Sequence, residues 1–462
     1  MKKMIAWLLV LTMALSLWGC GSDGAGSLGG GNPMRNEFAY YENQEDPEAA
    51  RQRLSLLLEP WEHLDTSVTL QSQVILENSQ ARVTLESLSY GQQVMTATFR
   101  VENLSDQSFD FYPALVVNGL RSTFGAEDTT VEPGAVEQIE LPCSAAYLIG
   151  SGTRRVDRLQ VFLSFRRDSE KQSFVVDAAL EGANPENVDP NSYITMMRDP
   201  EQAAQLGRKV LFLKEDLDFT AGDFAVDSAA VYFDYNDKLC IDIHVVNTAE
   251  ETRRLLLKGP FVNGVTDDNY HNNDYWGLVY PGTGCIVGCY AGSTERLEAL
   301  GIERIGAMDL IISDKSAKNP VLIADGQVLH LEAEEGNPGV PTGENEIYRD
   351  DTLCVRASGL SIVEREGIYW VFLPLVVQKL RDVKATISAG IIQIDGANPD
   401  STGNGVGPEM DYPGFMCLRV EKFFSREEAE AFVESCQKAE LRMGLRYDYG
   451  EAQTVEVTVP LS

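Results

Sequence analysis

The sequence predicts a mainly β protein made of tandem immunoglobulin-like β-sandwich repeats, with short helices between the strands. One observation behind this is a set of turn motifs that occurs twice and, more faintly, a third time. Another is that short runs of alternating apolar and polar residues lie between these turns, which is typical of half-buried strands. The motifs are Val101-Glu102-Asn103, Val117-Asn118-Gly119 and Pro133-Gly134, then Val246-Asn247, Val262-Asn263-Gly264 and Pro281-Gly282, and finally Ile394-Asp395-Gly396 and Pro413-Gly414.

The spacing of the motifs indicates duplication. The two Asn-Gly turns are 145 residues apart (118 to 263), and the first two Pro-Gly turns are 148 apart (133 to 281). An alternating strand that begins at Val156 returns at Ile305, an offset of 149 (156 to 305). Offsets this steady favour a repeated unit with small insertions in its loops.

Helices are expected at a few places. Asp46-Pro47 and Asp199-Pro200 each place an N-cap before a proline suited to the first helical turn. Ser425 and Glu428 form a capping box, which predicts an amphipathic helix over 426–438. We therefore expect each unit to run through strands, a Pro-Gly turn, a strand, a helix or helical turn, and two closing strands.

A chain of 462 residues is too long for one compact domain. Proline- and glycine-rich stretches at 182–190 and 334–341 read as linkers. They divide the folded part into three predicted sandwich units over 46–182, 195–335 and 346–462.

The chain is strongly acidic, with a formal net charge of −32. Nucleic-acid phosphates and anionic membrane surfaces would repel such a protein, so we expect neither as a partner of the folded part. The acidic residues are spread along the chain rather than gathered in one tail, which fits a role in solubility.

The N-terminus carries an export signal. Lys2 and Lys3 precede an apolar run, Met4 to Leu17, which is too short to span a bilayer. The sequence Leu17-Trp18-Gly19-Cys20 that follows resembles a bacterial lipobox, although Trp18 stands where a small residue is usual. The resemblance implies a signal peptide over 1–19, a lipid such as palmitate on Cys20, and anchoring at the extracytoplasmic face of the cell membrane. The alternative is an ordinary secretory signal with a chance cysteine.

Residues 20–45 follow as a glycine- and serine-rich tether. The rest of the chain has seven cysteines besides Cys20. We expect mostly buried thiols, with a Cys354–Cys436 disulfide as the alternative. Cys285 and Cys417 each come four residues after the proline of a Pro-Gly turn, so they are expected at equivalent strand positions.

Catalytic motifs are absent from the sequence. It has four histidines, and none belongs to a zinc-protease or nucleophile-elbow pattern. His244 lies on the polar face of a predicted strand and is expected to be exposed. We therefore expect no catalytic residues and no metal ligands, and a non-enzymatic protein.

One loop of the second unit combines aromatic and polar side chains. Aromatic rings can stack on sugar C–H faces while carboxylates and amides bind hydroxyl groups, so the loop is a candidate carbohydrate site. The alternative is that Tyr275 and Trp276 pack as core and that the acids are solvated turn residues. The candidate ligand-binding residues are Asp267, Asp268, Tyr270, His271, Asp274, Tyr275 and Trp276.

Two acidic stretches could also hold calcium. The 267–274 run and 234–237 are rich in oxygen ligands, but neither has the spacing of a recognised calcium loop. We therefore expect no cofactor, with calcium as the alternative. Paired carboxylates for glycoside hydrolysis stay open, since no particular pair stands out among seventy acids.

These observations predict a lipid-anchored extracytoplasmic lipoprotein that acts as a non-enzymatic binding or spacer module. Its expected partners are the membrane, through Cys20, and a glycan of the cell wall or an envelope protein. The alternative function is a structural or assembly partner of other envelope proteins, and a glycan-processing enzyme comes third.

Overall fold

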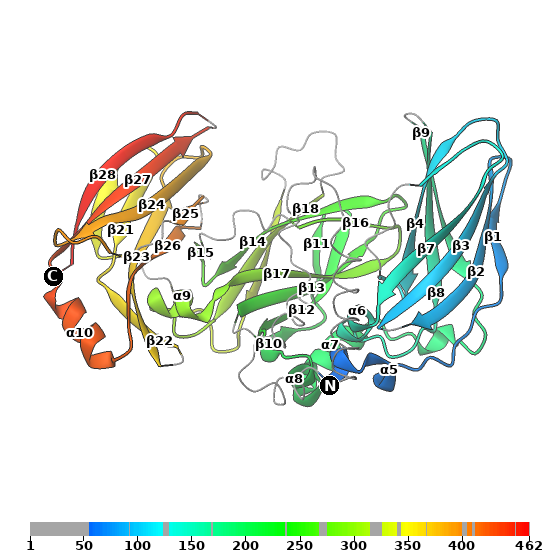
Figure 1. The fold of residues 1–462 in the computed structure, drawn as a ribbon, viewed down its shortest axis with the longest axis horizontal. Helices are drawn as coiled ribbons and strands as arrows, with labels where there is room; N and C mark the ends of the chain where they lie inside the picture. The colour runs from blue at the N-terminus through cyan, green and yellow to red at the C-terminus, as the bar shows by residue number, and fades with distance from the viewer. Residues whose placement is uncertain are drawn as a thin grey trace, which may run out of the picture.

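The computed structural model describes residues 55–91, 93–122, 129–167, 170–235, 238–267, 275–314, 326–339, 343–365, 367–399, 404–408, 412–448 and 450–461. These residues form three β-sandwich units that lie in a row, with the first unit on the right of Figure 1 and the third on the left. The prediction of tandem sandwich repeats is confirmed.

Unit 1 has one sheet with the strand order β1-β2-β3-β7 and a second in which β4 pairs β8, β8 pairs β9, and β6 lies on the other side of β4. Its interior is filled by the inward side chains of both sheets, among them Phe99, Phe111 and Val161. The strands are β1 (Gln73–Glu77), β2 (Ala81–Gly91), β3 (Val94–Asn103), β4 (Phe109–Val117), β5 (Leu120–Arg121), β6 (Thr129–Val131), β7 (Val136–Ser144), β8 (Leu159–Arg167) and β9 (Glu170–Ala178).

Unit 2 repeats this plan with the orders β10-β12-β13-β17 and β16-β14-β18-β19. The predicted alternation of Leu239, Ile241, Ile243 and Val245 is confirmed, because all four are buried in its core. The strands are β10 (Lys209–Lys214), β11 (Phe219–Ala221), β12 (Phe224–Phe233), β13 (Lys238–Asn247), β14 (Arg253–Val262), β15 (Thr266–Asp267), β16 (Tyr275–Val279), β17 (Gly284–Ser293), β18 (Ala307–Asp314) and β19 (Gln327–Glu332).

Unit 3 follows the same plan with the orders β20-β21-β23-β26 and β25-β24-β27-β28. The faint third copy of the motifs is therefore a true third unit. The strands are β20 (Asn345–Arg349), β21 (Leu353–Ala357), β22 (Ser361–Arg365), β23 (Ile368–Lys379), β24 (Ala385–Ile394), β25 (Asn404–Val406), β26 (Gly414–Phe423), β27 (Lys438–Tyr447) and β28 (Gln453–Pro460).

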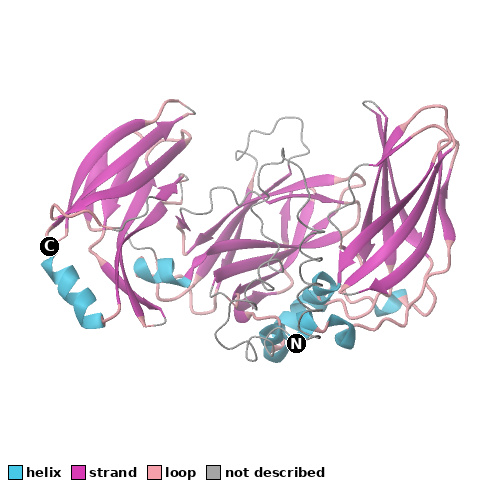
Figure 2. Ribbon diagram, viewed as in Figure 1, coloured by secondary structure: helices cyan, strands magenta, loops and turns pink. Residues whose placement is uncertain are grey.

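The helices are short and gather along one long side of the molecule (Figure 2). In each unit one helix stands between the last strand of the first sheet and the two closing strands, as predicted. These helices are α6 (Ala145–Gly150), α9 (Thr294–Ala299) and α10 (Arg426–Ser435). The predicted extension of the last helix to residue 438 is wrong: Cys436 is extended, and the backbone N–H groups of Gln437 and Lys438 bind Asp395 instead.

The remaining helices lie before and between units 1 and 2. The predicted cap at Asp199 is confirmed, since its carboxylate accepts hydrogen bonds from the N–H groups of Glu201 and Gln202. The predicted helix start at Asp46 lies outside the described residues, and Pro60 opens a second short helix after the first one ends. These helices are α4 (Ser55–Leu58), α5 (Pro60–His63), the 3₁₀ turn η1 (Pro185–Asn187), α7 (Ser192–Arg198) and α8 (Pro200–Gln205).

The repeated Asn-Gly and Asp-Gly turns have one structural role in all three units. Asn118, Asn263 and Asp395 all have positive φ, a conformation that Asn and Asp tolerate better than most residues. Each carboxamide or carboxylate then accepts hydrogen bonds from two successive backbone N–H groups at or just before the start of the first closing strand of its unit, which is β8, β18 or β27. The motifs that revealed the repeat therefore hold the scaffold together.

All seven described cysteines are buried free thiols, so the alternative of a Cys354–Cys436 disulfide is wrong. The expected equivalence of Cys285 and Cys417 is also wrong. Cys285 points into the core of its own unit, whereas Cys417 points out of unit 3 and donates to the carbonyl of Arg296 in α9 of unit 2. Both thiols are buried, but in different environments.

Candidate functional site

The predicted sugar-binding loop is anchored at both ends. At one end, the backbone of Asp267 pairs in parallel with Phe415 of unit 3. At the other end, Tyr275 and Trp276 belong to the edge strand β16 and pair with Leu257 and Leu256 of β14. Asp268, Tyr270, His271 and Asp274 lie outside the described residues, as do the side chains of Asp267, Tyr275 and Trp276. The loop thus starts at the junction of units 2 and 3 and ends on the edge strand of the second sheet of unit 2.

The second calcium candidate is a turn. Asp234 is buried, and its carboxylate accepts a hydrogen bond from the N–H group of Lys238. Asn236 and Asp237 lie outside the described residues. Within the described residues, no three His, Cys, Asp or Glu side chains come together as a metal site requires.

His244 is buried, and the prediction of an exposed histidine is wrong. Its side chain is 6% exposed, and its Nδ1 lies 2.8 Å from a carboxylate oxygen of Asp227. His244 lies on the outer face of β13. This face is covered by helices and by unit 1 instead of being exposed to solvent. Burial is the largest single influence on the pKa of Asp227 and would raise it. The hydrogen bond and charge interaction with His244, together with the hydrogen bond from Ser228, outweigh burial and hold this pKa below its usual value.

Asp227 and His244 are the residue types of a catalytic dyad, but they are not arranged to activate a nucleophile. The hydroxyl of Ser228 donates to Asp227 at 3.0 Å instead of donating to the imidazole, so no activated serine results. The Nε2 atom of His244 is turned toward Gly284 of the neighbouring strand, where a Cβ atom would lie 2.4 Å away. Glycine is therefore required at this position for the ring to fit.

A second buried ionic group lies on the same sheet face. Asp242 accepts hydrogen bonds from the hydroxyls of Tyr193 (2.6 Å) and Tyr232 (3.1 Å), with Arg208 at 3.8 Å. Burial, and then the nearby carboxylate, raise the pKa of Tyr193 well above its usual value. Tyr193 belongs to α7, so this group fixes α7 on the sheet. No sequence signal indicates this group, because the alternation predicts an exposed position at 242.

The most distinctive geometry lies at the two junctions between units. At the first junction β5 of unit 1 pairs in parallel with β17 of unit 2, at Leu120 and Gly284. This joins strands of both units into one ten-stranded sheet. At the second junction β15 of unit 2 pairs in parallel with β26 of unit 3, at Thr266 and Gly414. Each junction thus uses the residues just after an Asn-Gly turn to extend the first sheet of the next unit.

Stacked aromatic rings accompany both junctions. Tyr280 of unit 2 stacks on Phe162 of unit 1, and Tyr412 lies on Phe261 with ring centroids 3.9 Å apart. Both tyrosines come directly before a Pro-Gly turn, so Tyr-Pro-Gly is a sequence signal of the junction, one that was not among the predicted motifs. The guanidinium of Arg121 closes the first junction by donating to the carbonyl of Leu278 at 2.6 Å.

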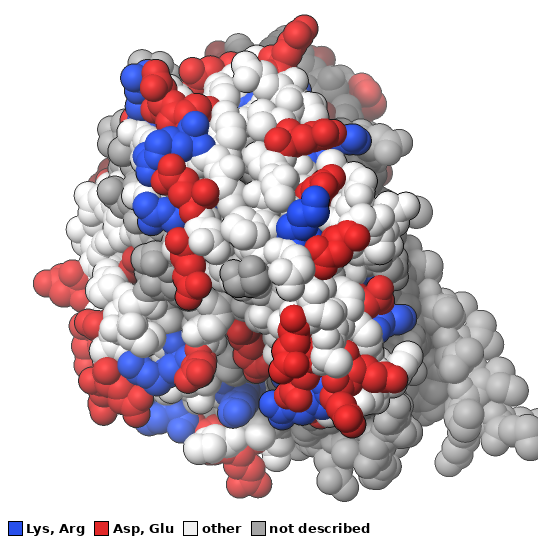
Figure 3. All heavy atoms as spheres, turned by 90° about the vertical axis from the view of Figure 1, so that its left-hand side faces the viewer, with Lys and Arg blue, Asp and Glu red and all other residues white. Residues whose placement is uncertain are grey.

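The outermost unit surfaces differ from these junctions. On β7 of unit 1 the outward side chains are Val136, Gln138, Glu140 and Pro142, which are all exposed. On β17 the outward residues are Gly284, Ile286, Gly288 and Tyr290, which are at least partly covered. At the end formed by unit 3, acidic and basic side chains stand side by side, as Figure 3 shows, and include ion pairs such as Arg442–Glu456. The outward face of β7 is thus exposed and the end of unit 3 is charged, whereas the junction strand β17 is covered.

No protein-family model matches the chain, and no curated protein matches its sequence. Among solved structures it is similar to dimeric latent PorU from Porphyromonas gingivalis, at 10% identity over 86% of this chain and 34% of that one, with a TM-score of 0.16. The chain thus spans about a third of that protein's length. Two further matches also cover 86% of this chain: a glycosyl hydrolase family 2 member from Bacteroides cellulosilyticus DSM 14838 (6% identity, 79% of that chain, TM-score 0.14) and a central fibronectin-III array of RIM-binding protein (7%, 99%, 0.12). At these TM-scores the likeness carries no argument about function.

Proposed function

We propose that the protein is an extracytoplasmic lipoprotein, anchored through Cys20, that serves as a non-enzymatic spacer and binding module. The observation that supports it most is the repeated junction. Parallel strand pairing and a stacked tyrosine hold each unit on the next, which restricts the relative rotation expected of units on free linkers. A row of units held in this way suits a spacer that keeps a binding surface away from its anchor.

The anchor is proposed from the sequence Leu17-Trp18-Gly19-Cys20. No helix in the described part of the chain is long and apolar enough to cross a membrane. Metabolic labelling with a radioactive fatty acid tests the anchor directly. We expect label on the wild-type protein and none on Cys20→Ser, whereas equal labelling of both would place the lipid elsewhere.

The binding role is assigned to the loop of unit 2 that contains Tyr275 and Trp276, with a cell-wall glycan as its ligand. A pull-down of the detergent-solubilised full chain on insoluble cell wall and a polysaccharide panel tests this, with and without calcium. We expect binding that is lost in a Tyr275→Ala/Trp276→Ala double variant. Binding that survives in the double variant would move the site, and no binding would leave assembly with envelope proteins as the function.

A further inference from the structure

Unit 2 contains an open groove of about 720 Å³. One wall is β10, and the other is formed by residues 302–305 and 333–335. Phe233, Leu297 and Ile302 give it an apolar floor. Its charged lining residues are Lys209, Lys214 and Arg304 together with Glu298, Glu303, Glu334 and Glu335. This size suits a short peptide or a small molecule.

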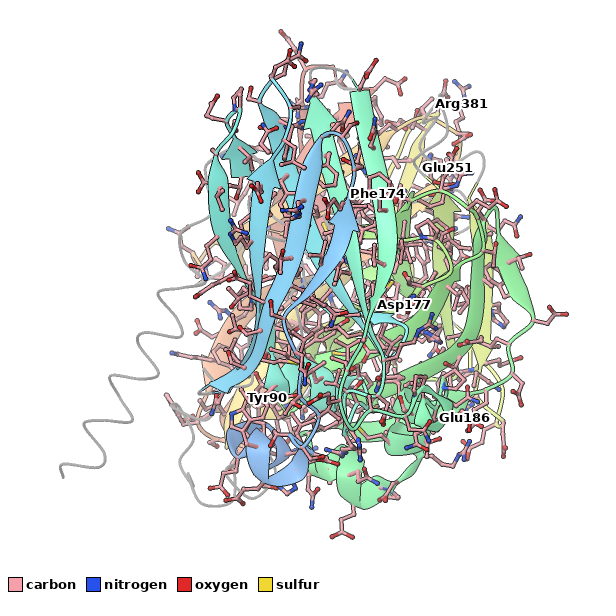
Figure 4. All side chains as sticks on the ribbon, turned by 90° about the vertical axis from the view of Figure 1, so that its right-hand side faces the viewer. Tyr90, Phe174, Asp177, Glu186, Glu251 and Arg381 are labelled. Carbon is pink, nitrogen blue, oxygen red and sulfur yellow. The ribbon has the colours of Figure 1, made fainter. Side chains whose placement is uncertain are left out.

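In unit 1 the equivalent place is filled by the chain itself. Residues 64–70 run past the segment that precedes β8 and the segment that follows β9. The N–H group of Asp65 donates to the carbonyl of Arg154 at 2.8 Å, and Thr69 and Glu181 exchange two backbone hydrogen bonds of 3.1 and 2.8 Å. Val68 between them is fully buried, and the hydroxyl of Tyr90, labelled in Figure 4, donates to its carbonyl.

Side chains add specificity to this contact in unit 1. A guanidinium nitrogen of Arg155 lies 3.1 Å from the carboxylate of Asp65. The carboxylate of Glu181 accepts hydrogen bonds from the side chains of Thr69 and Gln71. Arg155 therefore binds an acidic residue at one end of the segment. Glu181 binds a hydroxyl or amide side chain four to six residues later.

The two units can be matched residue by residue here. Asn118 donates to the carbonyl of Arg155, and Asn263 donates to the carbonyl of Arg304. The strand register extends this correspondence to the neighbouring strand. Leu159 pairs with Ala178 in unit 1, as Met308 pairs with Leu331 in unit 2. Glu303, Arg304, Glu334 and Glu335 thus correspond to Arg154, Arg155, Glu181 and Gly182. In agreement, Arg155 donates to the carbonyl of Gly182, and Arg304 to that of Glu335.

Among the residues that the structure describes, the corresponding backbone groups of unit 2 have no partner. The carbonyl of Glu303 and both backbone groups of Glu334 form no hydrogen bond with another described residue. The reason for the opening is local. Upstream of β11, unit 2 places β10 in the first sheet beside β12, and the residues before it form α8. No described segment crosses to residues 303 and 334 as residues 65–69 cross in unit 1.

We propose that this groove binds an extended peptide segment of a partner protein, in the way that unit 1 binds residues 65–69. The segment would pair with the backbone at Glu303 and Glu334 and bury a small apolar residue on the floor. It would also place an acidic side chain on Arg304, in exchange for the carboxylate of Glu335 that now lies 3.4 Å from this guanidinium. Backbone pairing of this kind supplies affinity while the pockets select side chains. The occupant is assigned to a partner and not to a second copy, because the 65–69 segment of this chain is already held in unit 1 by the backbone hydrogen bonds of Asp65 and Thr69 and by the buried Val68.

The inference is independent of the anchor and of the aromatic loop, so its failure would leave the proposed function standing. The test uses a fluorescein-labelled peptide with the sequence of Leu64–Gln71 and the detergent-solubilised full chain, followed by fluorescence anisotropy. We expect saturable binding to the wild type, at least tenfold weaker binding to Arg304→Glu, and unchanged binding to Lys171→Glu. Lys171 lies on β9 of unit 1, so this variant changes the charge equally away from the groove.

A reversed charge pair sharpens the test. A peptide with lysine in place of the Asp65 residue is expected to bind Arg304→Glu at least tenfold more tightly than it binds the wild type. Circular dichroism of each variant checks that the fold is intact. No saturable binding up to about 1 mM would overturn the proposal. Equal binding by Arg304→Glu would also overturn it.

Two further outcomes would name a different occupant. If the protein dimerises in sedimentation and the peptide dissociates the dimer, the groove holds a second copy of this chain. If the peptide binds only after the residues before Ser55 are removed, a segment of the chain itself fills the groove. Either result would overturn the assignment to a partner protein.

Discussion

The ring of Tyr280 lies flat on the ring of Phe162, with centroids 3.8 Å apart and planes 13° from parallel. Phe162 belongs to unit 1 and Tyr280 to unit 2, and both side chains are buried. The residue before the Pro-Gly turn of unit 1 is Glu132, which is exposed. The aromatic residue therefore occurs where the turn meets a preceding unit.

Removal of the Tyr280 ring is expected to weaken the first junction. Tyr280→Ala should lower the free energy of unfolding by about 3–5 kcal/mol, because a fully buried aromatic side chain leaves a cavity. Tyr280→Phe keeps the stacking and should cost about 1 kcal/mol or less. Urea unfolding followed by intrinsic fluorescence measures both. Equal losses in the two variants would show that the hydroxyl, and not the ring, stabilises the junction.

The buried turn residue Asn263 provides a second prediction. Asn263→Ala removes the acceptor of the N–H groups of Gly306 and Ala307, so two buried donors lose their partner. The cost should be about 3 kcal/mol or more. Asn263→Asp keeps this acceptor, as Asp395 does in unit 3, and should cost less than Asn263→Ala. Thermal unfolding of the three proteins checks the order, and an alanine variant as stable as the aspartate variant would contradict it.

Asp350 should make unit 3 sensitive to acid. Burial would raise its pKa, but hydrogen bonds from Tyr447, from the backbone of Leu353 and Thr352, and from Tyr348 outweigh this effect and lower it below 3.8. The unfolded chain therefore takes up this proton at a higher pH than the folded chain. The stabilisation is present above pH 3.8 and is lost as the pH falls through the lowered value.

The measurement is thermal unfolding from pH 7 to pH 3, with Asp350→Asn as the comparison. We expect the wild type to lose stability more steeply than Asp350→Asn below about pH 4. Tyr447→Phe removes one hydrogen bond to Asp350 and should give an intermediate slope. Parallel curves for the wild type and Asp350→Asn would remove Asp350 as the cause of acid sensitivity.

The buried thiols predict a chemical count. Burial raises the pKa of Cys143, Cys285 and Cys289 to about 12, and a thiol without its thiolate reacts slowly. In the native protein at pH 8 we expect a disulfide reagent to label none of the seven described cysteines. In guanidinium chloride it should label seven if Cys20 carries its lipid, and eight if Cys20 is free. Fewer than seven would indicate a disulfide.

Much of the scaffold could be predicted because turns and inward strand faces leave a local record. Asn118 and Asn263 mark positive-φ turns, and Leu239 to Val245 mark a strand with one buried face. Each of these signals depends on neighbours in the sequence, and so it survives in a single chain. The helices between the strands were predictable for the same reason, through the cap at Ser425.

The outward faces could not be predicted, because what covers them lies far away in the sequence. Asp242 and His244 alternate with core residues as exposed residues do, yet α7 and unit 1 cover them. The groove of unit 2 left no local signal either. A peptide-binding role for the groove is inferred by matching residues 303 and 334 to residues 154 and 181. This match comes from the strand register, which the sequence alone does not provide.

Residues 65–69 determine where a force on the N-terminal tether acts on unit 1. A pull from the tether would first load the packing of α4 and α5 on α6. It would then reach the hydrogen bonds of residues 65–69 with Arg154 and Glu181, which lie beside the two closing strands of the unit. The ion pair between Arg155 and Asp65 stands at the same place. A stretched tether would therefore pull on the unit at the base of its second sheet. Residues 65–69 would have to detach before the terminal strand β1 bore any load.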